Sequence, residues 1–257
     1  MEQDREQAKQ VLHQLMELGE AMLVNGAEVN RVEDTLVRLG SAYGASQMHV
    51  FVITSSVIIT MVLPDGDEIT QTRRILGAGG TDFKKVEALN ALSRRCCSQP
   101  LPIAELESEI EQLKRAAPNP QYLCLGSALA AGSFAVFYGG SLVDGIFAAL
   151  FGLLIYAMQE SIAPFCMNKV IFILLAAFLS GIGICLCGRI APGLQVDKIM
   201  IGDIMLLIPG IAMTNAIRDI LIGDTIAGLM RLIESLLWAC ALACGFMLAM
   251  SIAGVRV

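Results

Sequence analysis

Three long stretches of this chain carry no charged side chain: residues 116–143, 170–188 and 235–255. An α-helix needs about 20 predominantly apolar residues to cross the roughly 30 Å hydrocarbon core of a bilayer. Apolar runs of this length have few explanations in a soluble protein, because a helix at a protein surface keeps one polar face. The sequence therefore predicts a protein that crosses a lipid bilayer several times.

The charged residues gather in the N-terminal part of the chain. Residues 1–117 carry 12 Lys and Arg and 17 Asp and Glu, whereas the longer segment 118–257 carries 6 and 7. The first density is typical of a domain in water and the second of a membrane domain. We therefore expect an α-helical membrane protein with an N-terminal soluble α+β domain over 1–117 and a transmembrane domain over 118–257.

The composition excludes several classes of protein. With 55% hydrophobic residues the chain is not disordered, and a net charge of −6 with a pI near 5.0 gives no basic surface for nucleic acid. Most of the cysteines lie in or beside apolar stretches, and the two histidines, His13 and His49, form no zinc-ligand spacing. We expect no metal and no cofactor.

The predicted soluble domain shows no recognisable catalytic motif. It lacks a nucleophile elbow, a phosphate-binding loop and a histidine–carboxylate pairing at a known spacing. We therefore expect that the chain is not an enzyme. A membrane-anchored sensor or hydrolase acting through this domain stays open as the alternative, although a simple anchor does not need several spans.

Periodicity predicts the elements of the soluble domain. Helical spacing of apolar residues, and short β-branched runs separated by turn residues, distinguish helices from strands. The expected helices are 6–24, 28–40, 82–97 and 102–115, and the expected strands are 49–54, 57–63 and 68–75.

Five transmembrane spans are predicted, at about 121–138, 142–159, 169–189, 199–222 and 230–255. Nine glycines suggest close helix packing, at 126, 132, 145, 152, 181, 183, 188, 202 and 245. The fourth span differs from the rest because Asp203, Pro209–Gly210 and Arg218–Asp219 interrupt it. Backbone groups freed by a proline are tolerated only inside protein or beside water, as in transporters with discontinuous helices. The break is either part of a substrate site or a structural kink.

Positively charged residues give a weak orientation signal. Lys114, Arg115, Lys169, Arg218 and Arg231 fall on the N-terminal side of the membrane in a five-span arrangement, and no signal-peptide pattern begins the chain. We expect the N-terminal domain in the cytoplasm and the C-terminus outside.

Two motifs carry a resemblance to a known family. Residues 25–35, with Gly26, Glu28, Arg31, Glu33 and Asp34, resemble the N-terminal signature of the threonine/serine exporter family. Residues 209–219, followed by Gly223–Asp224, Gly228, Arg231 and Glu234, resemble its membrane signature. A solvated stripe of ion pairs is the plainer interpretation of the charges in the first motif.

The resemblance implies a secondary exporter of small amino acids, threonine or serine, driven by the membrane potential or the proton gradient across the bacterial cytoplasmic membrane. At 257 residues the chain resembles the large half of a split exporter, which implies a separate five-span partner protein; a higher oligomer stays open. Export of a dicarboxylate such as succinate is the alternative within transport.

The fourth span supplies the candidate site. We expect Pro209, Gly210, Thr214 and Asn215 to hold the polar ends of the substrate, with Arg218 on its carboxylate and Asp219 beside it. Alternatively, Arg218 and Asp219 are anchors at the membrane surface.

A proton-coupled exporter also needs a carboxyl group that changes its protonation state. Asp203, in apolar surroundings, is the first candidate for this proton-coupling role. Glu234 is the second, with Arg231 three residues before it as its expected ion-pair partner.

Overall fold

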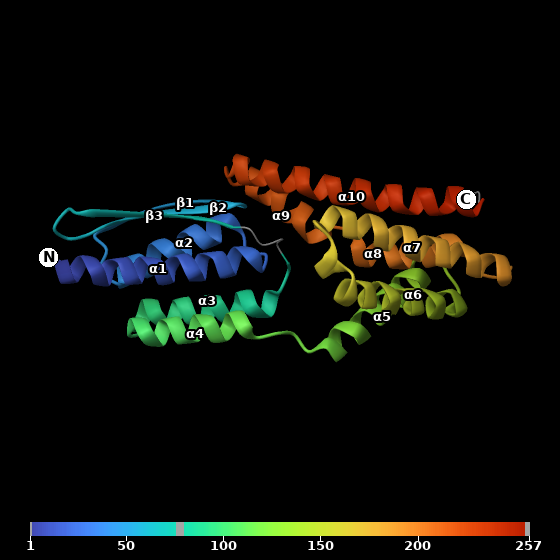
Figure 1. Cartoon of the computed structure of the whole chain (residues 1–257), viewed down its shortest axis with the longest axis horizontal. Helices are drawn as coiled ribbons and strands as arrows, with labels where there is room; N and C mark the ends of the chain where they lie inside the picture. Colours follow the sequence, from blue (N-terminus) through green and yellow to red (C-terminus); the bar gives the residue numbers. More distant parts are fainter. Residues whose placement is uncertain (1, 76–79, 255–257) are drawn as a thin grey trace. The chain divides into compact units, whose positions relative to one another are not determined.

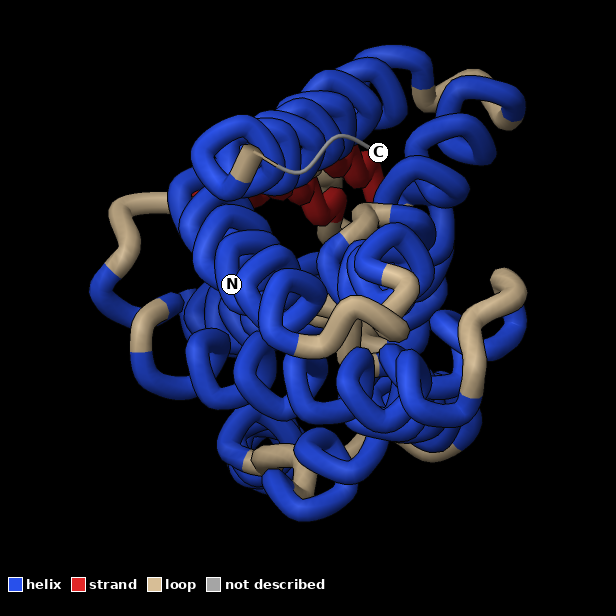
Figure 2. The backbone as a smooth tube through the Cα atoms, turned by 90° about the vertical axis from the view of Figure 1, so that its right-hand side faces the viewer, coloured by secondary structure: helices blue, strands red, loops and turns tan. Residues whose placement is uncertain are grey.

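The computed structural model describes residues 2–75 and 80–254 of the chain. The chain is mostly helical, and the strands are confined to one small sheet (Figure 2). It divides into two compact units. The first comprises Met1–Ala117 with Ala212–Leu232, and the second comprises Pro118–Ile211 with Ile233–Val257.

The first unit is built in three layers. Its elements are α1 (Glu2–Val24), α2 (Val29–Ala42), β1 (Gln47–Ile53), β2 (Ser56–Val62), β3 (Glu68–Arg74), α3 (Phe83–Ser98) and α4 (Ile103–Arg115). The α1–α2 pair lies between the sheet on one side and the α3–α4 pair on the other (Figure 1). This middle position explains why α1 is buried on most of its faces, where its sequence alone predicts an amphipathic helix with one buried side.

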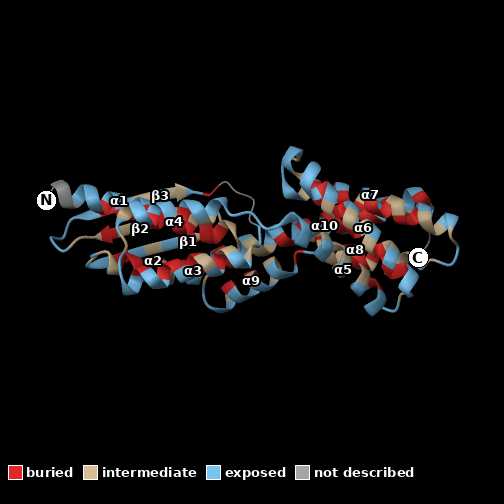
Figure 3. Cartoon of the chain, turned by 90° about the horizontal axis from the view of Figure 1, so that it is seen from below, coloured by how far each residue is buried: buried red, intermediate tan, exposed pale blue. Residues whose placement is uncertain are grey.

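The sheet is antiparallel, with the strand order β1–β2–β3. Along β2 every second side chain is buried, namely Val57, Ile59 and Met61. Side chains at this spacing point to one face of a strand, and here that face covers the helices. The apolar side chains of both helix layers and the sheet form a single core (Figure 3).

A glycine sets the turn between α1 and α2. Gly26 has a φ of +93°, which side chains with a Cβ rarely adopt. A Cβ at this position would also lie 3.1 Å from the carbonyl oxygen of Gly80. The Asn25 amide closes the end of α1 by donating to the carbonyl of Ala21 at 2.6 Å. Gly26 of the N-terminal motif therefore sets the backbone turn between α1 and α2.

The second unit contains the long apolar helices. Its elements are α5 (Pro120–Phe137), α6 (Leu142–Ser161), the short 3₁₀ helix η1 (Ala163–Phe165), α7 (Lys169–Ile190) and α8 (Val196–Leu207). Two further helices, α9 (Gly210–Leu221) and α10 (Thr225–Ala253), contribute residues to both units.

Four helices, α5, α6, α7 and α10, are each long and apolar enough to cross a membrane. The pair α8 and α9 is a fifth candidate, bent by 52° at a break of two residues. The fourth predicted span, 199–222, thus consists of two separate helices. The fifth helix begins at Thr225, before the expected residue 230, and residue 255 lies outside the described part of the chain.

Glycines allow the helices of the second unit to approach closely. A Cβ on Gly202 of α8 would overlap the Ala131 carbonyl oxygen of α5, and one on Gly245 of α10 would lie 2.7 Å from the Leu174 carbonyl oxygen of α7. At eight of the nine glycines predicted to pack closely, an added Cβ would lie less than 3.0 Å from a neighbouring atom. Gly126 is the exception, since no atom of the described chain lies within 4 Å of its Cβ position.

We predict that Gly202→Ala lowers the free energy of unfolding by about 1–3 kcal/mol, because the added methyl must push α8 away from the backbone of α5. Gly126→Ala is the matched control. It should be neutral or stabilise by up to about 1 kcal/mol, since alanine favours helix and the space is open. Unfolding of the purified chain in detergent measures both, and equal effects of the two substitutions would contradict the packing described here.

Candidate functional site

The break between α8 and α9 follows from one proline. Pro209 has no N–H and cannot donate to the carbonyl of Met205, so the hydrogen-bond ladder of α8 stops. The last helical bond runs from the N–H of Ile208 to the carbonyl of Ile204, at 2.9 Å. The N–H of Gly210 then donates to the carbonyl of Ile208, which is a tight turn, and α9 begins. Pro209 is buried, whereas Gly210 and Thr214 are exposed.

Asp203 is buried in α8 without a partner. Its side chain is 0% exposed, and neither carboxylate oxygen has a hydrogen-bond partner in the part of the chain that the structure describes. It follows Gly202, where α8 packs closely against the backbone of α5. An unpaired charge in such a place is costly.

A second buried carboxylate in the same unit, Asp144, has hydrogen-bond partners for both of its oxygens. One of its oxygens accepts hydrogen bonds from the Ser141 N–H at 2.8 Å and hydroxyl at 2.7 Å, forming a capping box at the start of α6. The other accepts from the N–H of Gln195 at 2.9 Å. Asp144 is thus fully satisfied by its surroundings, in contrast to Asp203.

The third buried carboxylate, Asp219 of α9, forms an ion pair with Arg231 of α10 at 3.0 Å. The two side chains are 0% and 13% exposed. A turn with Gly223 at a φ of +105° reverses the chain between them, and a Cβ on Gly228 would lie 2.8 Å from the Ala216 carbonyl oxygen. The sequence predicts Glu234 as the partner of Arg231. The structure instead shows an ion pair with Asp219, because the two helices form a hairpin.

The two signature motifs meet in the first unit. Nη1 of Arg218 on α9 lies 2.6 Å from Oε1 of Glu28, which immediately precedes α2. The Arg218 side chain is 56% exposed and that of Glu28 is 17% exposed. No sequence spacing indicates this pair, because 190 positions separate the two residues. Their common membership of two motifs is the one signal that could have suggested it.

The remaining charges of the N-terminal motif have separate partners. Glu33 accepts a hydrogen bond from the N–H of Val52 at 2.8 Å, and burial, followed by repulsion from Asp224 and Asp34, raises its pKa. Asp34 pairs with Arg38 at the surface, at 3.3 Å. Within residues 2–75 and 80–254, Arg31 forms no salt bridge. The charges of this motif therefore do not form a single ion-pair stripe.

Two further predicted residues lie on α9 and α10. Asn215 is half-buried on α9, and Glu234 is exposed on α10. Glu234 is close enough to interact electrostatically with Lys169, whose ammonium group lies over the Trp238 ring, 3.9 Å from its centre. In the described part of the chain no group of three or more His, Cys, Asp and Glu side chains could hold a metal ion.

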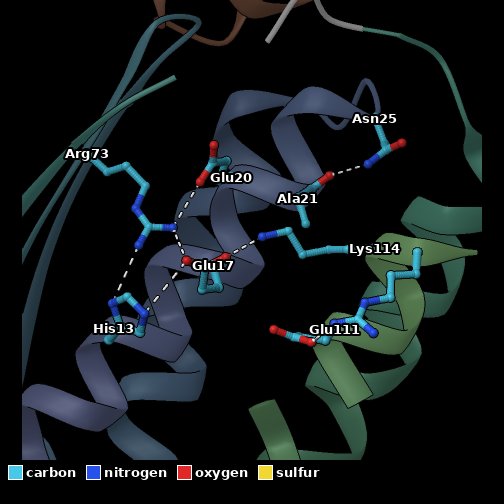
Figure 4. Close-up of polar contacts among 9 residues, drawn as sticks. His13, Glu17, Glu20, Ala21, Asn25, Arg73, Glu111 and Lys114 are labelled. Atoms are coloured by element: carbon cyan, nitrogen blue, oxygen red, sulfur yellow. Dashed lines mark hydrogen bonds and ion pairs between the residues drawn. The ribbon is translucent and has the colours of Figure 1, made fainter. Parts of the chain in front are cut away.

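A cavity of about 280 Å³ in the first unit lies between α1 and α4, lined by His13, Gln14, Glu17, Glu107, Ile110, Glu111, Lys114 and Arg115. Glu17 accepts from Arg73 at 2.5 Å and from Lys114, and Arg73 also reaches Glu20 at 2.9 Å (Figure 4). Burial opposes ionisation of Glu17, but the two cations hold its pKa below the usual range. These ion pairs join β3 and α4 to α1, which is a structural role.

We predict that Asp219→Asn destabilises the protein by about 3 kcal/mol or more, because it leaves the guanidinium of Arg231 buried beside a neutral group. Asp34→Asn is the matched control in the same unit. Both partners of its ion pair are 73% exposed, so the change should be below about 1 kcal/mol. Thermal and denaturant unfolding of the full chain measure both variants, and a harmless Asp219→Asn would show that the pair is dispensable.

The comparisons with known proteins agree with a membrane protein built from apolar helices. The chain matches the family described as "Putative threonine/serine exporter" (ThrE) over residues 13–253. It is 22% identical over 257 residues to the "Probable succinate transporter subunit YjjP" of Klebsiella aerogenes. The match covers 100% of this chain and 99% of that protein. No solved structure matches the chain significantly.

The family match confirms the resemblance carried by the two motifs, and it also confirms the expectation of a transporter in place of an enzyme. The apolar helices α5, α6, α7 and α10 agree with a protein that crosses the membrane several times. The chain belongs to the threonine/serine exporter family and is a multi-pass membrane protein.

Proposed function

We propose that this chain is one subunit of a two-component secondary exporter for small amino acids, threonine or serine, in the bacterial cytoplasmic membrane. The family description supports the amino-acid substrate. The relative, which the chain matches from end to end, is described as a transporter subunit and supports a partner. That partner is a small five-span membrane protein which supplies the other wall of the pathway, as in transporters built from two inverted halves.

The charges around Arg218 carry the choice of substrate. Glu28, Asp219, Asp224 and Glu33 interact with one another or with Arg218 in the first unit, and Arg231 is the other cation of this group. Carboxylates outnumber guanidinium groups, so the region suits a substrate that brings an ammonium group with its carboxylate. A dianion such as succinate is the second candidate, favoured by the description of the relative.

The residues of α9 then divide into two roles. Arg218 binds the substrate carboxylate, because its guanidinium group is exposed and matches that group with two parallel hydrogen bonds. Pro209, Gly210, Thr214 and Asn215 present the backbone and side-chain groups that take the other polar end. Asp219 keeps the α9–α10 hairpin in place through Arg231.

Asp203 is the proposed proton carrier, and Glu234 is the second candidate. In the second unit Asp203 is a buried carboxylate with no hydrogen-bond partner in the described chain, whereas Asp144 is fully bonded. The soluble domain over 1–117 lies in the cytoplasm in this proposal, and the transmembrane domain is 118–257. The positive residues that flank the predicted spans support this orientation.

Efflux of labelled threonine, serine and succinate tests the proposal, in cells that lack their own exporters. The chain is expressed alone and together with its five-span candidate partner. We expect threonine or serine efflux only when both chains are present. Succinate efflux from the same pair would keep the architecture and overturn the amino-acid substrate. Efflux by the chain alone would overturn the two-component arrangement.

We predict that Asp203→Asn abolishes gradient-driven efflux but leaves exchange of external for internal substrate, because the variant cannot take up or release a proton. Asp197→Asn is the matched control on the same helix, since the Asp197 side chain is 42% exposed and pairs with Lys198 at 3.0 Å. An unaltered pH dependence of efflux in Asp203→Asn would remove Asp203 from the mechanism.

A further inference from the structure

We propose that Glu28 is a positioning residue of the export cycle: its carboxylate holds the guanidinium group of Arg218 until the carboxylate of a substrate takes its place. This inference rests on the proposed function, in which Arg218 binds the substrate. It gives the N-terminal motif a direct part in transport, because Glu28 belongs to that motif and Arg218 to the membrane signature.

The geometry leaves most of the guanidinium group available. Glu28 contacts it through one oxygen, Oε1, at Nη1. A guanidinium group has five N–H donors in a planar fork. Across residues 2–75 and 80–254, Glu28 is the only hydrogen-bonding or ion-pair partner of the Arg218 guanidinium group. With 56% of its side chain exposed, Arg218 can receive a second carboxylate before it releases the first.

The second arginine of the α9–α10 hairpin is much less accessible than Arg218. Arg231 lies on the same helical hairpin and pairs with the fully buried Asp219 at 3.0 Å. Its own side chain is 13% exposed, so an incoming carboxylate cannot reach it without opening the hairpin. One arginine of the hairpin is therefore structural and the other is exchangeable.

The position of Glu28 is also better explained by Arg218 than by its helix. Glu28 occupies the N-cap position of α2, where Ser, Thr, Asp and Asn are preferred, and its side chain makes no cap hydrogen bond. The turn at Gly26 and the buried side chain of Ala27 fix the backbone just before it. The carboxylate is thus presented from a rigid point, as a positioning group must be.

The energetics permit exchange. Ion pairs between partly exposed side chains contribute little to stability, because water competes for both partners. A substrate carboxylate that takes two N–H donors of the fork makes a stronger contact than the single one with Glu28. A weak internal partner keeps Arg218 oriented and yields to the substrate.

The inference predicts an unusual direction of effect. Glu28→Gln removes the internal competitor and should lower the apparent dissociation constant for substrate. If the pair is closed about nine-tenths of the time, the gain in affinity is about tenfold. Maximal efflux should fall in the same variant, because Arg218 has no carboxylate to return to when the substrate leaves. A merely structural defect would weaken binding instead.

Two measurements test this with the full chain. The first is equilibrium binding of labelled threonine and labelled succinate to the chain purified together with its partner in detergent. The second is the concentration dependence of efflux when both are expressed. Glu111→Gln is the matched control, because Glu111 also pairs with an exposed arginine, Arg115, at 2.6 Å. It should change neither quantity.

The charge-swapped double variant Glu28→Arg with Arg218→Glu separates positioning from folding. It should keep the stability of the original chain while leaving binding and efflux at background, because the guanidinium group has moved off α9. Recovered efflux in the swap, or unchanged or weaker binding to Glu28→Gln, would overturn the role of Glu28. If Arg218→Gln binds and exports normally, the proposed substrate role of Arg218 fails as well, which identifies the proposed function as the error.

Discussion

A polar or charged group that water cannot reach must find its partner inside the protein, and this requirement governs the structure at each of its unusual points. Asp144 meets it with three hydrogen bonds at the start of α6, and Asp219 meets it with the guanidinium group of Arg231. Pro209 cannot donate a hydrogen bond, so α8 ends at Leu207 and a new helix, α9, begins at Gly210. Asp203 is a buried carboxylate that does not meet this requirement within the described chain, which is why we propose it as the proton carrier.

Ion pairs connect residues of the two signature motifs. On helix α9, Arg218 forms an ion pair with Glu28, and Asp219 forms an ion pair with Arg231. The hairpin that makes this arrangement needs glycine at 223 for its turn and at 228 for its close packing. Glycine at 26 sets the turn before Glu28 in the same way. The glycines of the two motifs thus position the charged residues beside them.

Much of the fold was accessible from the sequence because it depends on local patterns. The charge-free stretches mark α5, α7 and α10, and the alternation of β-branched residues marks the strands. The proline predicts a break near residue 209, and the structure places it there. The chemistry of the site was only partly accessible. Spacing suggested that Arg231 pairs with Glu234 within one helix, but an ion pair with Asp219 joins it to a different helix. The pairing of Glu28 with Arg218 had no local signal at all.

The sequence by itself determined that this chain crosses a membrane, that its fourth apolar segment cannot be one continuous helix, and that its two motifs resemble those of an exporter family. These conclusions follow from hydropathy, from the missing N–H of proline and from the identity of neighbouring residues, all of which are properties of short segments. Only the tertiary structure decided which carboxylates are satisfied and which arginine stays exposed. The partners of Arg218 and Asp219 lie on other elements of the fold, and the packing of helices brings them together.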